Sequence, residues 1–318
     1  MAAFNEETTA QNVIDALGSE AKGKTFVITG PSQGGIGASA AIHLAKGKPE
    51  RLVLAGRSLD KIQPVIDEIK ATGPSVSVDF VALDLLDRDS VRQAGEEIKR
   101  LASKGISGLI NNAGIMAVEH FTKSKNGVEG QFETNHVGHF LLTSILMPEI
   151  QKAKGVVVNV SSLGYMYGGN WDLEDTDFGT YDCWEAYDRS KLANVLFSIG
   201  LAKRMAGFGG AAFSVNPGFI PETKLLANSD VTEKRLTAAF EDATKKNGGV
   251  APVARVATIE QGAANLIMPA LNPDLRKSSG AFITECAIGS IPDWVGGAES
   301  AEKLWRLSEK LIGQEVVI

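Results

Sequence analysis

Apolar residues fall into two kinds of stretch along this chain, and the two kinds alternate. The first kind is a short run rich in valine, isoleucine and leucine, typical of strands buried on both faces. These runs lie at residues 25–28, 51–55, 106–110, 156–160, 212–215 and 281–284, and residues 75–83 predict a further strand because Val76, Val78 and Phe80 alternate with other residues. The second kind repeats its apolar residues every three or four positions, which predicts amphipathic helices. We expect helices over residues 8–20, 36–45, 59–70, 87–103, 127–152, 184–205, 258–270 and 299–312, with a break near Pro148 in the fifth.

Strands that alternate with helices in this way predict a parallel sheet covered by helices on both faces. We therefore expect an α/β fold, a single doubly wound Rossmann-type domain over residues 1–318 with a parallel seven-stranded sheet. Residues 219–256 have a mixed pattern, and we expect them to form a substrate flap. The segment from Ser162 to Tyr187 is rich in glycine, aspartate and aromatic residues, and we expect it to shape the substrate entrance.

A glycine-rich loop, Thr29-Gly30-Pro31-Ser32-Gln33-Gly34-Gly35-Ile36-Gly37, joins the first predicted strand to the helix that follows it. Glycine lets the backbone turn tightly and approach a phosphate without a Cβ in the way. The free amides at the start of the helix favour an anion there. The loop therefore predicts a phosphate-binding turn, in which either Gly34 or Gly35 is the central glycine.

The composition indicates an ordinary globular protein of 318 residues, with 44% hydrophobic and 22% charged residues. The net charge of −6 and the lack of a basic tract argue against a nucleic-acid partner. No apolar run approaches the ~20 residues of a membrane helix. Two cysteines, Cys183 and Cys286, suggest no disulfide framework, and we expect a cytoplasmic location. We expect no metal site: His136 and His139 favour a packing or capping role.

Polar residues gather where the predicted strands end, and these ends meet at one edge of a parallel sheet. Tyr187 and Lys191 follow on the next helix, four positions apart and so on the same face. An ammonium stabilises a phenolate and lowers the pKa of a tyrosine, which can then exchange a proton near neutral pH. A serine hydroxyl, from Ser161 or Ser162, can hold the same substrate oxygen. These groups suit the reduction of a carbonyl by a nicotinamide, or the reverse step.

The chain resembles the short-chain dehydrogenase/reductase family over nearly its whole length. The matching pieces are Thr29–Gly37, Asn111–Gly114, Asn135, Ser162, Tyr187, Lys191 and Pro217-Gly218. Thr8-Thr9-Ala10 ahead of Gly23-Lys24, and Ser190-Lys191-Leu192-Ala193-Asn194, resemble the retinol-dehydrogenase and WW-domain-oxidoreductase branch. No WW domain is present in the sequence.

The resemblance implies a role for each matching residue. Tyr187 would be the acid/base, and Lys191 would bind the nicotinamide ribose and lower the pKa of that tyrosine. Ser162 would hold the carbonyl, and Asn135 would position Lys191 through water. With the glycine loop and the end of the second strand, the expected cofactor site comprises Gly30, Ser32, Gln33, Gly35, Ile36, Gly37, Arg57, Ser58, Asp84, Leu85, Asn111, Ala113, Gly114, Tyr187, Lys191, Pro217, Gly218, Ile220 and Thr223.

The end of the second strand also predicts which cofactor is preferred. In dinucleotide folds, an acidic residue about 20 positions beyond the glycine loop holds the 2′-hydroxyl of NAD. Arg57 occupies that place here, with Ser58 beside it. A guanidinium attracts a 2′-phosphate and can bond it with two donors, whereas a carboxylate would repel it. We therefore expect NADP(H).

The sequence thus predicts an NADP(H)-dependent oxidoreductase that acts on a carbonyl/alcohol pair, with an apolar ketone or aldehyde as substrate. One alternative is a cofactor-binding regulatory or scaffold protein with little turnover. Another is an enzyme like the sugar-nucleotide epimerases, which have a similar fold and Tyr/Lys pair. The family resemblance further implies a homodimer or homotetramer.

Overall fold

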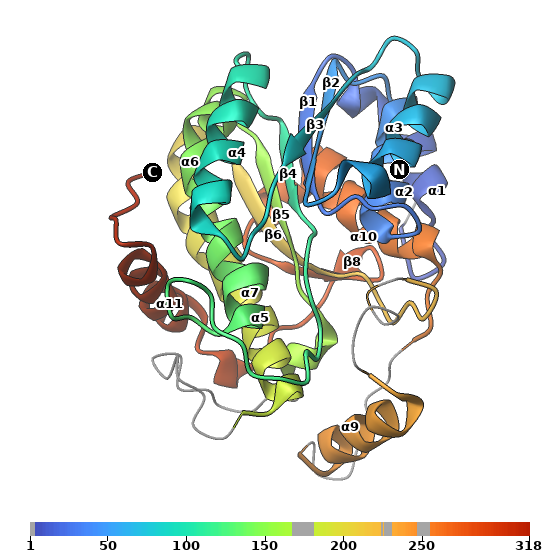
Figure 1. Cartoon of the computed structure of the whole chain (residues 1–318). Helices are drawn as coiled ribbons and strands as arrows, with labels where there is room; N and C mark the ends of the chain where they lie inside the picture. Colours follow the sequence, from blue (N-terminus) through green and yellow to red (C-terminus); the bar gives the residue numbers. More distant parts are fainter. Residues whose placement is uncertain (1–3, 167–180, 224, 226–230, 247–254) are drawn as a thin grey trace.

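The computed structural model describes residues 4–166, 181–223, 225, 231–246 and 255–318. A central sheet is covered on both faces by helices, as Figure 1 shows. The strands are β1 Thr25–Thr29, β2 Arg51–Gly56, β3 Ser77–Ala82, β4 Gly108–Asn111, β5 Val156–Val160, β6 Ala211–Asn216, β7 Phe282–Thr284 and β8 Ala287–Ile288. The main helices are α1 Ala10–Leu17, α2 Ile36–Lys46, α3 Leu59–Thr72, α4 Arg88–Leu101, α5 Gly130–Phe132, α6 Gly138–Lys152, α7 Cys183–Met205, α9 Glu233–Lys246, α10 Ile259–Leu271 and α11 Gly297–Ile312.

The strand order is β3-β2-β1-β4-β5-β6-β7-β8, which confirms the doubly wound fold. The first seven strands pair in parallel, and β8 pairs antiparallel with β7. The sheet therefore has eight strands rather than the expected seven. The extra strand has only two residues and follows a tight turn in which Glu285 and Cys286 both have positive φ, so no apolar pattern marked it.

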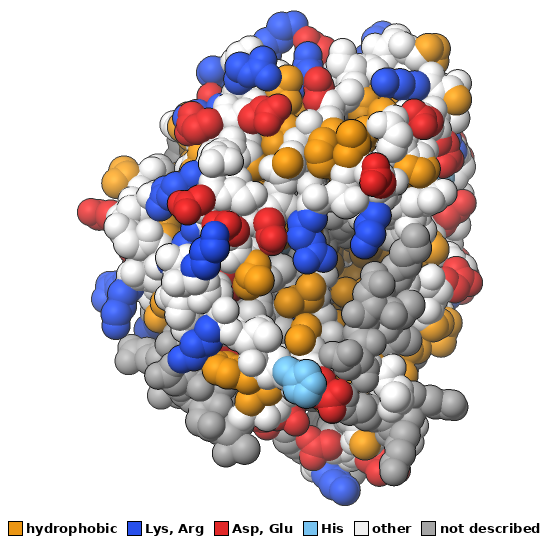
Figure 2. All heavy atoms as spheres, viewed as in Figure 1, with side chains coloured by type: hydrophobic (Ala, Val, Ile, Leu, Met, Phe, Trp, Pro, Cys, Tyr) orange, Lys and Arg blue, Asp and Glu red, His pale blue; other side chains and the backbone are white. Residues whose placement is uncertain are grey.

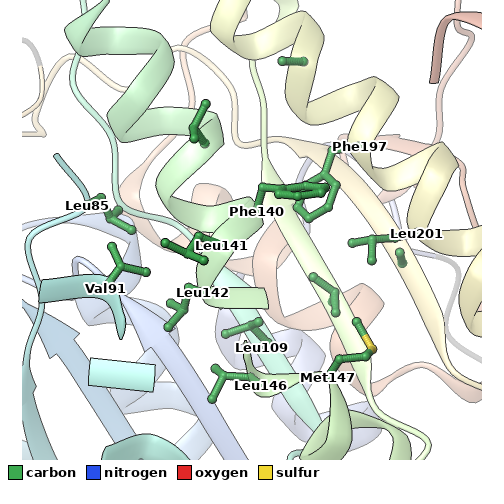
Figure 3. Close-up of a cluster of buried hydrophobic side chains, with 14 of the residues drawn as sticks. Leu85, Val91, Leu109, Phe140, Leu141, Leu142, Leu146, Met147, Phe197 and Leu201 are labelled. Atoms are coloured by element: carbon green, nitrogen blue, oxygen red, sulfur yellow. The ribbon is translucent and has the colours of Figure 1, made fainter. Parts of the chain in front are cut away.

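Alternate residues of each strand enter one of two cores. Val27, Val53 and Leu109 face the core under α4, α6, α7 and α11. Phe26, Leu52 and Ile110 face the core under α1, α2, α3 and α10. Figure 3 shows the first core, where side chains of α6 such as Phe140 and Leu146 meet Leu109 of β4 and Phe197 of α7. Burial on both faces explains why most of the strands are apolar runs, whereas the edge-side β3 alternates and is partly exposed.

Several helices begin at an Asp or Thr residue whose side chain accepts a hydrogen bond from the first amides of the helix. Asp87 caps α4 and Asp182 caps α7, while Thr9 and Thr258 form capping boxes at α1 and α10. The expected break near Pro148 is wrong, because α6 continues through that residue. The irregularity lies earlier, in a π-helical turn over Glu133–Val137. Within the described residues, no helix has the length and apolarity needed to cross a membrane.

Candidate active site

A cavity of about 1520 Å³ opens at the carboxyl ends of the parallel strands. The segments that follow β1 to β6 line it, because the sheet order reverses between β1 and β4 and leaves a crevice there. Figure 2 shows a hollow near the middle of this face, with basic and apolar side chains around it. The predicted residues that line the cavity are Gly30, Ser32, Gln33, Gly35, Ile36, Gly37, Arg57, Ser58, Asp84, Leu85, Ala113, Gly114, Ser162, Tyr187, Lys191, Pro217, Gly218, Ile220 and Thr223.

The glycine loop packs too tightly for side chains at two positions. A Cβ on Gly30 would lie 2.8 Å from the Cα of Ala113, and a Cβ on Gly37 would lie 2.4 Å from the Nδ2 of Asn112. Gly35 lines the cavity and caps α2, whereas Gly34 supplies a turn at φ 78° and does not line the cavity. The structure therefore places Gly35, rather than Gly34, at the cavity wall.

The first turn of α2 meets the requirements for binding a phosphate. Its N-cap residue, Gly35, has no side chain, so no side-chain hydrogen bond caps the first amides of the helix. Uncapped amides at a helix N-terminus, together with the helix dipole, stabilise an anion. Ser32 and Gln33 line the cavity beside this turn. The loop and helix thus fit the diphosphate of a dinucleotide cofactor.

Basic side chains lie where β2 ends. Arg57 and Ser58 line the cavity, and Ser58 is the N-cap residue of α3. Lys61, one turn into α3, also lines it, and its carbonyl accepts a hydrogen bond of 2.9 Å from the amide of Gln33. Sequence reasoning missed Lys61, although its spacing of four residues from Arg57 was a usable signal. Asp60 is not part of the cavity wall.

Tyr187, Lys191 and Ser162 meet on the floor of the cavity. Tyr187 and Lys191 lie one turn apart on α7, with the Nζ of the lysine 5.4 Å from the centre of the tyrosine ring. Ser162 follows β5, and its side chain lies near enough to the Tyr187 hydroxyl to lower the pKa of that phenol. The neighbouring Ser161 instead donates to the carbonyl of Lys191 at 2.7 Å. The structure therefore pairs Ser162, and not Ser161, with the tyrosine.

Burial sets the protonation of both residues of the Tyr/Lys pair. It raises the pKa of the Tyr187 phenol, and the Ser162 side chain only partly opposes this. It lowers the pKa of Lys191 to about 8. The expectation that the ammonium lowers the pKa of Tyr187 is therefore not met in this structure, because desolvation of the phenolate outweighs other effects. Near neutral pH the phenol keeps its proton and can donate it.

Asn135 lies in the π-helical turn, behind the cavity wall. Its side-chain oxygen accepts from the amide of Ile115 at 2.8 Å, and its Nδ2 donates to the carbonyl of Ile115 and to the Oγ of Ser190, each at 2.9 Å. A Cβ added to Gly114 would lie 3.1 Å from the Oδ1 of Asn135 and 3.5 Å from the Nζ of Lys191. The side chains of Asn135 and Lys191 thus lie close to Gly114. A larger residue at position 114 would crowd both of them.

Asn111 does not reach the cavity. It is buried in β4, where its Nδ2 donates to Thr143 and to Asn159. The next residue, Asn112, lines the cavity and donates to the carbonyls of Thr29 and Gly30. The expected role of Asn111 at the cofactor therefore does not agree with its position. Strand alternation could have separated the two asparagines, because adjacent residues at the end of a strand point to opposite sides.

Apolar side chains also line the cavity. They come from five segments, and they are Val118, Leu163, Trp184, Phe219 and Phe240. Phe219 begins the expected flap and pairs with Val256 near its end, and α9 lies between them. Most of the segment expected to shape the substrate entrance, residues 167–180, lies outside the described residues.

Comparison with known proteins agrees with this geometry. Residues 24–234 match the family model of the short chain dehydrogenases. Retinol dehydrogenase 12 of Mus musculus is 33% identical over 294 residues, covering 92% of this chain and 87% of that protein. Short-chain dehydrogenase TIC 32 B, chloroplastic, of Brassica napus is 32% identical over 322 residues, covering 97% of this chain and 94% of that protein.

Solved structures show the same fold. An uncharacterized protein from Mycobacterium Paratuberculosis superposes with a TM-score of 0.69 at 29% identity, covering 93% of this chain and 96% of that one. NADPH-bound carbonyl reductase from chicken fatty liver superposes with a TM-score of 0.59 at 20% identity, covering 85% of this chain and 100% of that one. The chain belongs to the short-chain dehydrogenase/reductase family of oxidoreductases and resembles its retinol dehydrogenase branch.

Proposed function

We propose that this chain is an NADP(H)-dependent oxidoreductase that interconverts an apolar ketone or aldehyde and its alcohol. The observation that carries the proposal is the contact between Tyr187 and Ser162, with Lys191 beside them, at the point where the glycine loop and an apolar pocket meet. This arrangement brings a proton donor, a hydroxyl that can hold an oxygen, and a buried cation to one place.

The residues of the chain have complementary tasks in this reaction. A bound nicotinamide cofactor would supply the hydride for reduction, or accept it in the reverse direction. Tyr187 donates its phenolic proton to the carbonyl oxygen, which becomes the alcohol hydroxyl, and Ser162 holds that oxygen in place. Lys191, which lines the cavity, would contact the ribose of the bound cofactor. The phenolate then recovers a proton from solvent.

The preference for NADP(H) rests on the charges at the end of β2. Arg57 and Lys61 both line the cavity, and neither forms an ion pair with another described residue. Two cations at this edge favour a ribose that carries a phosphate. The carbonyl reductase with this fold, whose structure contains NADPH, is consistent with the choice.

The apolar substrate class rests on the wall formed by Val118, Leu163, Trp184, Phe219 and Phe240. Such a wall binds hydrocarbon surface, while the few polar groups fix the reacting oxygen. The resemblance to retinol dehydrogenases points the same way. We propose a cytosolic site of action, which the two free cysteines favour.

The test follows the loss of NADPH absorbance with a panel of ketones and aldehydes, for the parent and for Tyr187→Phe. The substitution keeps the ring and removes the proton donor, so turnover should fall by roughly 10²–10⁴-fold. The dissociation constant for NADPH, measured by fluorescence, should stay unchanged. Tyr165→Phe is the matched control, since the Tyr165 hydroxyl is buried without a hydrogen-bond partner among described residues.

Two outcomes would overturn parts of the proposal. Turnover of Tyr187→Phe within about tenfold of the parent would remove this residue from the mechanism, because general acid catalysis contributes more than that. Tight NADPH binding with no consumption of NADPH across the panel would instead favour a regulatory or scaffold protein.

A further inference from the structure

A buried histidine that the proposed chemistry does not use joins both halves of the site. His139 lies one turn beyond Asn135, is only 1% exposed and does not line the cavity. Its Nε2 lies 2.9 Å from the hydroxyl of Thr29, the last residue of β1 before the glycine loop. Its Nδ1 lies 3.0 Å from the carbonyl of Asn135 in the π-helical turn. The imidazole therefore bridges the cofactor loop and the turn beside Lys191.

The hydrogen bonds of Thr29 decide which nitrogen of His139 carries the proton. The Thr29 hydroxyl accepts from the amides of Asn112, at 2.9 Å, and Ala113, at 3.0 Å. A hydroxyl has two lone pairs and one proton, so its remaining bond must be a donation, and Nε2 of His139 must be the acceptor. Nδ1 then carries the ring proton and donates it to the Asn135 carbonyl.

The bridge connects groups that contact the cofactor cavity on both sides. Asn112 and Ala113, held by Thr29, line the cavity, and Ala113 packs on Gly30. Asn135 donates to Ser190, which in turn donates to the carbonyl of Tyr187 at 2.7 Å. A change at His139 should therefore reach both the wall under the glycine loop and the start of α7.

We infer that His139 is a positioning residue, which as the neutral Nδ1–H tautomer holds the Asn135 turn against Thr29 and so sets the cofactor loop relative to Lys191. This inference rests on the proposed function for its effect on turnover, but its effect on cofactor binding and its tautomer can be measured without turnover. The burial of the ring, which lowers the pKa of His139 to about 4, keeps it neutral at the pH of the assay.

The first test is a double-mutant cycle on the dissociation constant of NADPH. Thr29→Val removes the donor hydroxyl and His139→Leu removes its acceptor. Each should weaken binding between about 5-fold and 100-fold, because each leaves a buried polar group unpaired. The double variant should bind NADPH only slightly less tightly than the single variant with the lower NADPH affinity. Both single variants already break the hydrogen bond between Thr29 and His139, so combining them removes little more. Effects that multiply in the double variant would overturn the inference.

Two further variants separate positioning from general packing. His139→Gln keeps one donor and one acceptor and should restore part of the NADPH affinity and of kcat/KM lost in His139→Leu. His43→Gln is the matched control, because His43 is also buried but, among the residues that the structure describes, its ring bonds only to Ser39 of α2. It should leave the affinity for NADPH and the pH profile of kcat/KM unchanged. Equal losses in His43→Gln and His139→Leu would reduce His139 to a packing residue.

A third measurement uses the parent protein and does not depend on whether any variant folds. The ¹⁵N shifts of the His139 imidazole report the protonated nitrogen directly. We expect a neutral ring protonated at Nδ1 at neutral pH, both with and without NADPH. An Nε2–H tautomer or a charged ring would overturn the inference, even if no ketone or aldehyde proves to be a substrate.

Discussion

At the scale of single residues, burial controls the chemistry that the site can perform. Tyr187 keeps its proton because the pKa of its phenol is raised, which suits donation to a carbonyl oxygen. The pKa of Lys191 is lowered to about 8, so its ammonium is charged at pH 7 and loses that charge as the pH rises further. Arg57 lines the cavity where β2 ends, within reach of a phosphate on the cofactor ribose.

The prediction at this scale is cofactor choice. A charged hydrogen bond contributes about 1.5–3 kcal/mol, so Arg57 should favour NADPH over NADH by roughly 10–100-fold in dissociation constant. Arg57→Asp should erase or reverse this preference and leave the ketone site intact. Arg92→Asp makes the same change in net charge on the surface of α4, and it should leave the preference for NADPH over NADH unchanged. If the parent protein binds NADH as tightly as NADPH, the assignment of Arg57 to the phosphate of NADPH is wrong.

At the scale of elements, α9 adds apolar side chains to the cavity wall. Leu236, Ala239, Phe240 and Ala243 recur at helical spacing and line the cavity, so one side of this helix faces inward. Phe240 meets Phe219 edge to face, with ring centres 6.3 Å apart. In Figure 1, α9 is set apart from the helices that cover the sheet. The helix therefore lines the cavity rather than contributing to either hydrophobic core of the described residues.

The matching prediction concerns Phe240→Ser. Losing this ring removes apolar surface that a bulky substrate would cover. The binding free energy should weaken by about 25 cal/mol for each Å² of apolar surface no longer buried. We expect kcat/KM to fall about tenfold for bulky apolar ketones and to change little for small ones, with NADPH affinity unchanged. Glu241→Ser alters the same helix at a position that does not line the cavity. Parallel losses for large and small ketones would contradict the role of α9.

At the scale of the whole molecule, stability depends on two neutral histidines in the core. Burial lowers the pKa of His136 to about 3 and that of His139 to about 4, from the ordinary 6.5. The Nε2 of His136 pairs with the hydroxyl of Ser308 on α11, so the π-helical turn also anchors the last helix. The structure thus buries both histidines, as a packing role requires, and the positioning role inferred for His139 is additional to that burial.

Acid should destabilise the fold in a defined window. The folded protein keeps both histidines neutral, whereas the unfolded chain protonates them below pH 6.5, so stability falls as the pH drops from about 6.5 towards 4. Each histidine should cost about 2 kcal/mol in unfolding free energy between pH 7.5 and 5, measured by urea denaturation. His136→Gln should lessen this pH dependence, while the exposed His120→Gln should not. A pH dependence unchanged by His136→Gln would contradict the assignment.

The sequence by itself determined the order of strands and helices and the family. Apolar runs marked six of the eight strands because burial on both faces leaves few polar positions in them, and the alternation of apolar and polar residues marked the partly exposed β3. Tyr187, Lys191 and the glycine loop could be found because each carries a local signal: a spacing of four residues, or glycines between a strand and a helix. The antiparallel β8 was missed because two residues carry no period.

Only the tertiary structure decided which residues face the cavity and which lie behind it. Asn111 and Asn112, or Ser161 and Ser162, are chemically identical neighbours, and the hydrogen bonds of distant segments separate them. The bridge from Thr29 through His139 to Asn135 joins residues 110 positions apart, so no local pattern could reveal it. Protonation likewise follows from burial, which depends on the packing of the whole chain around each group.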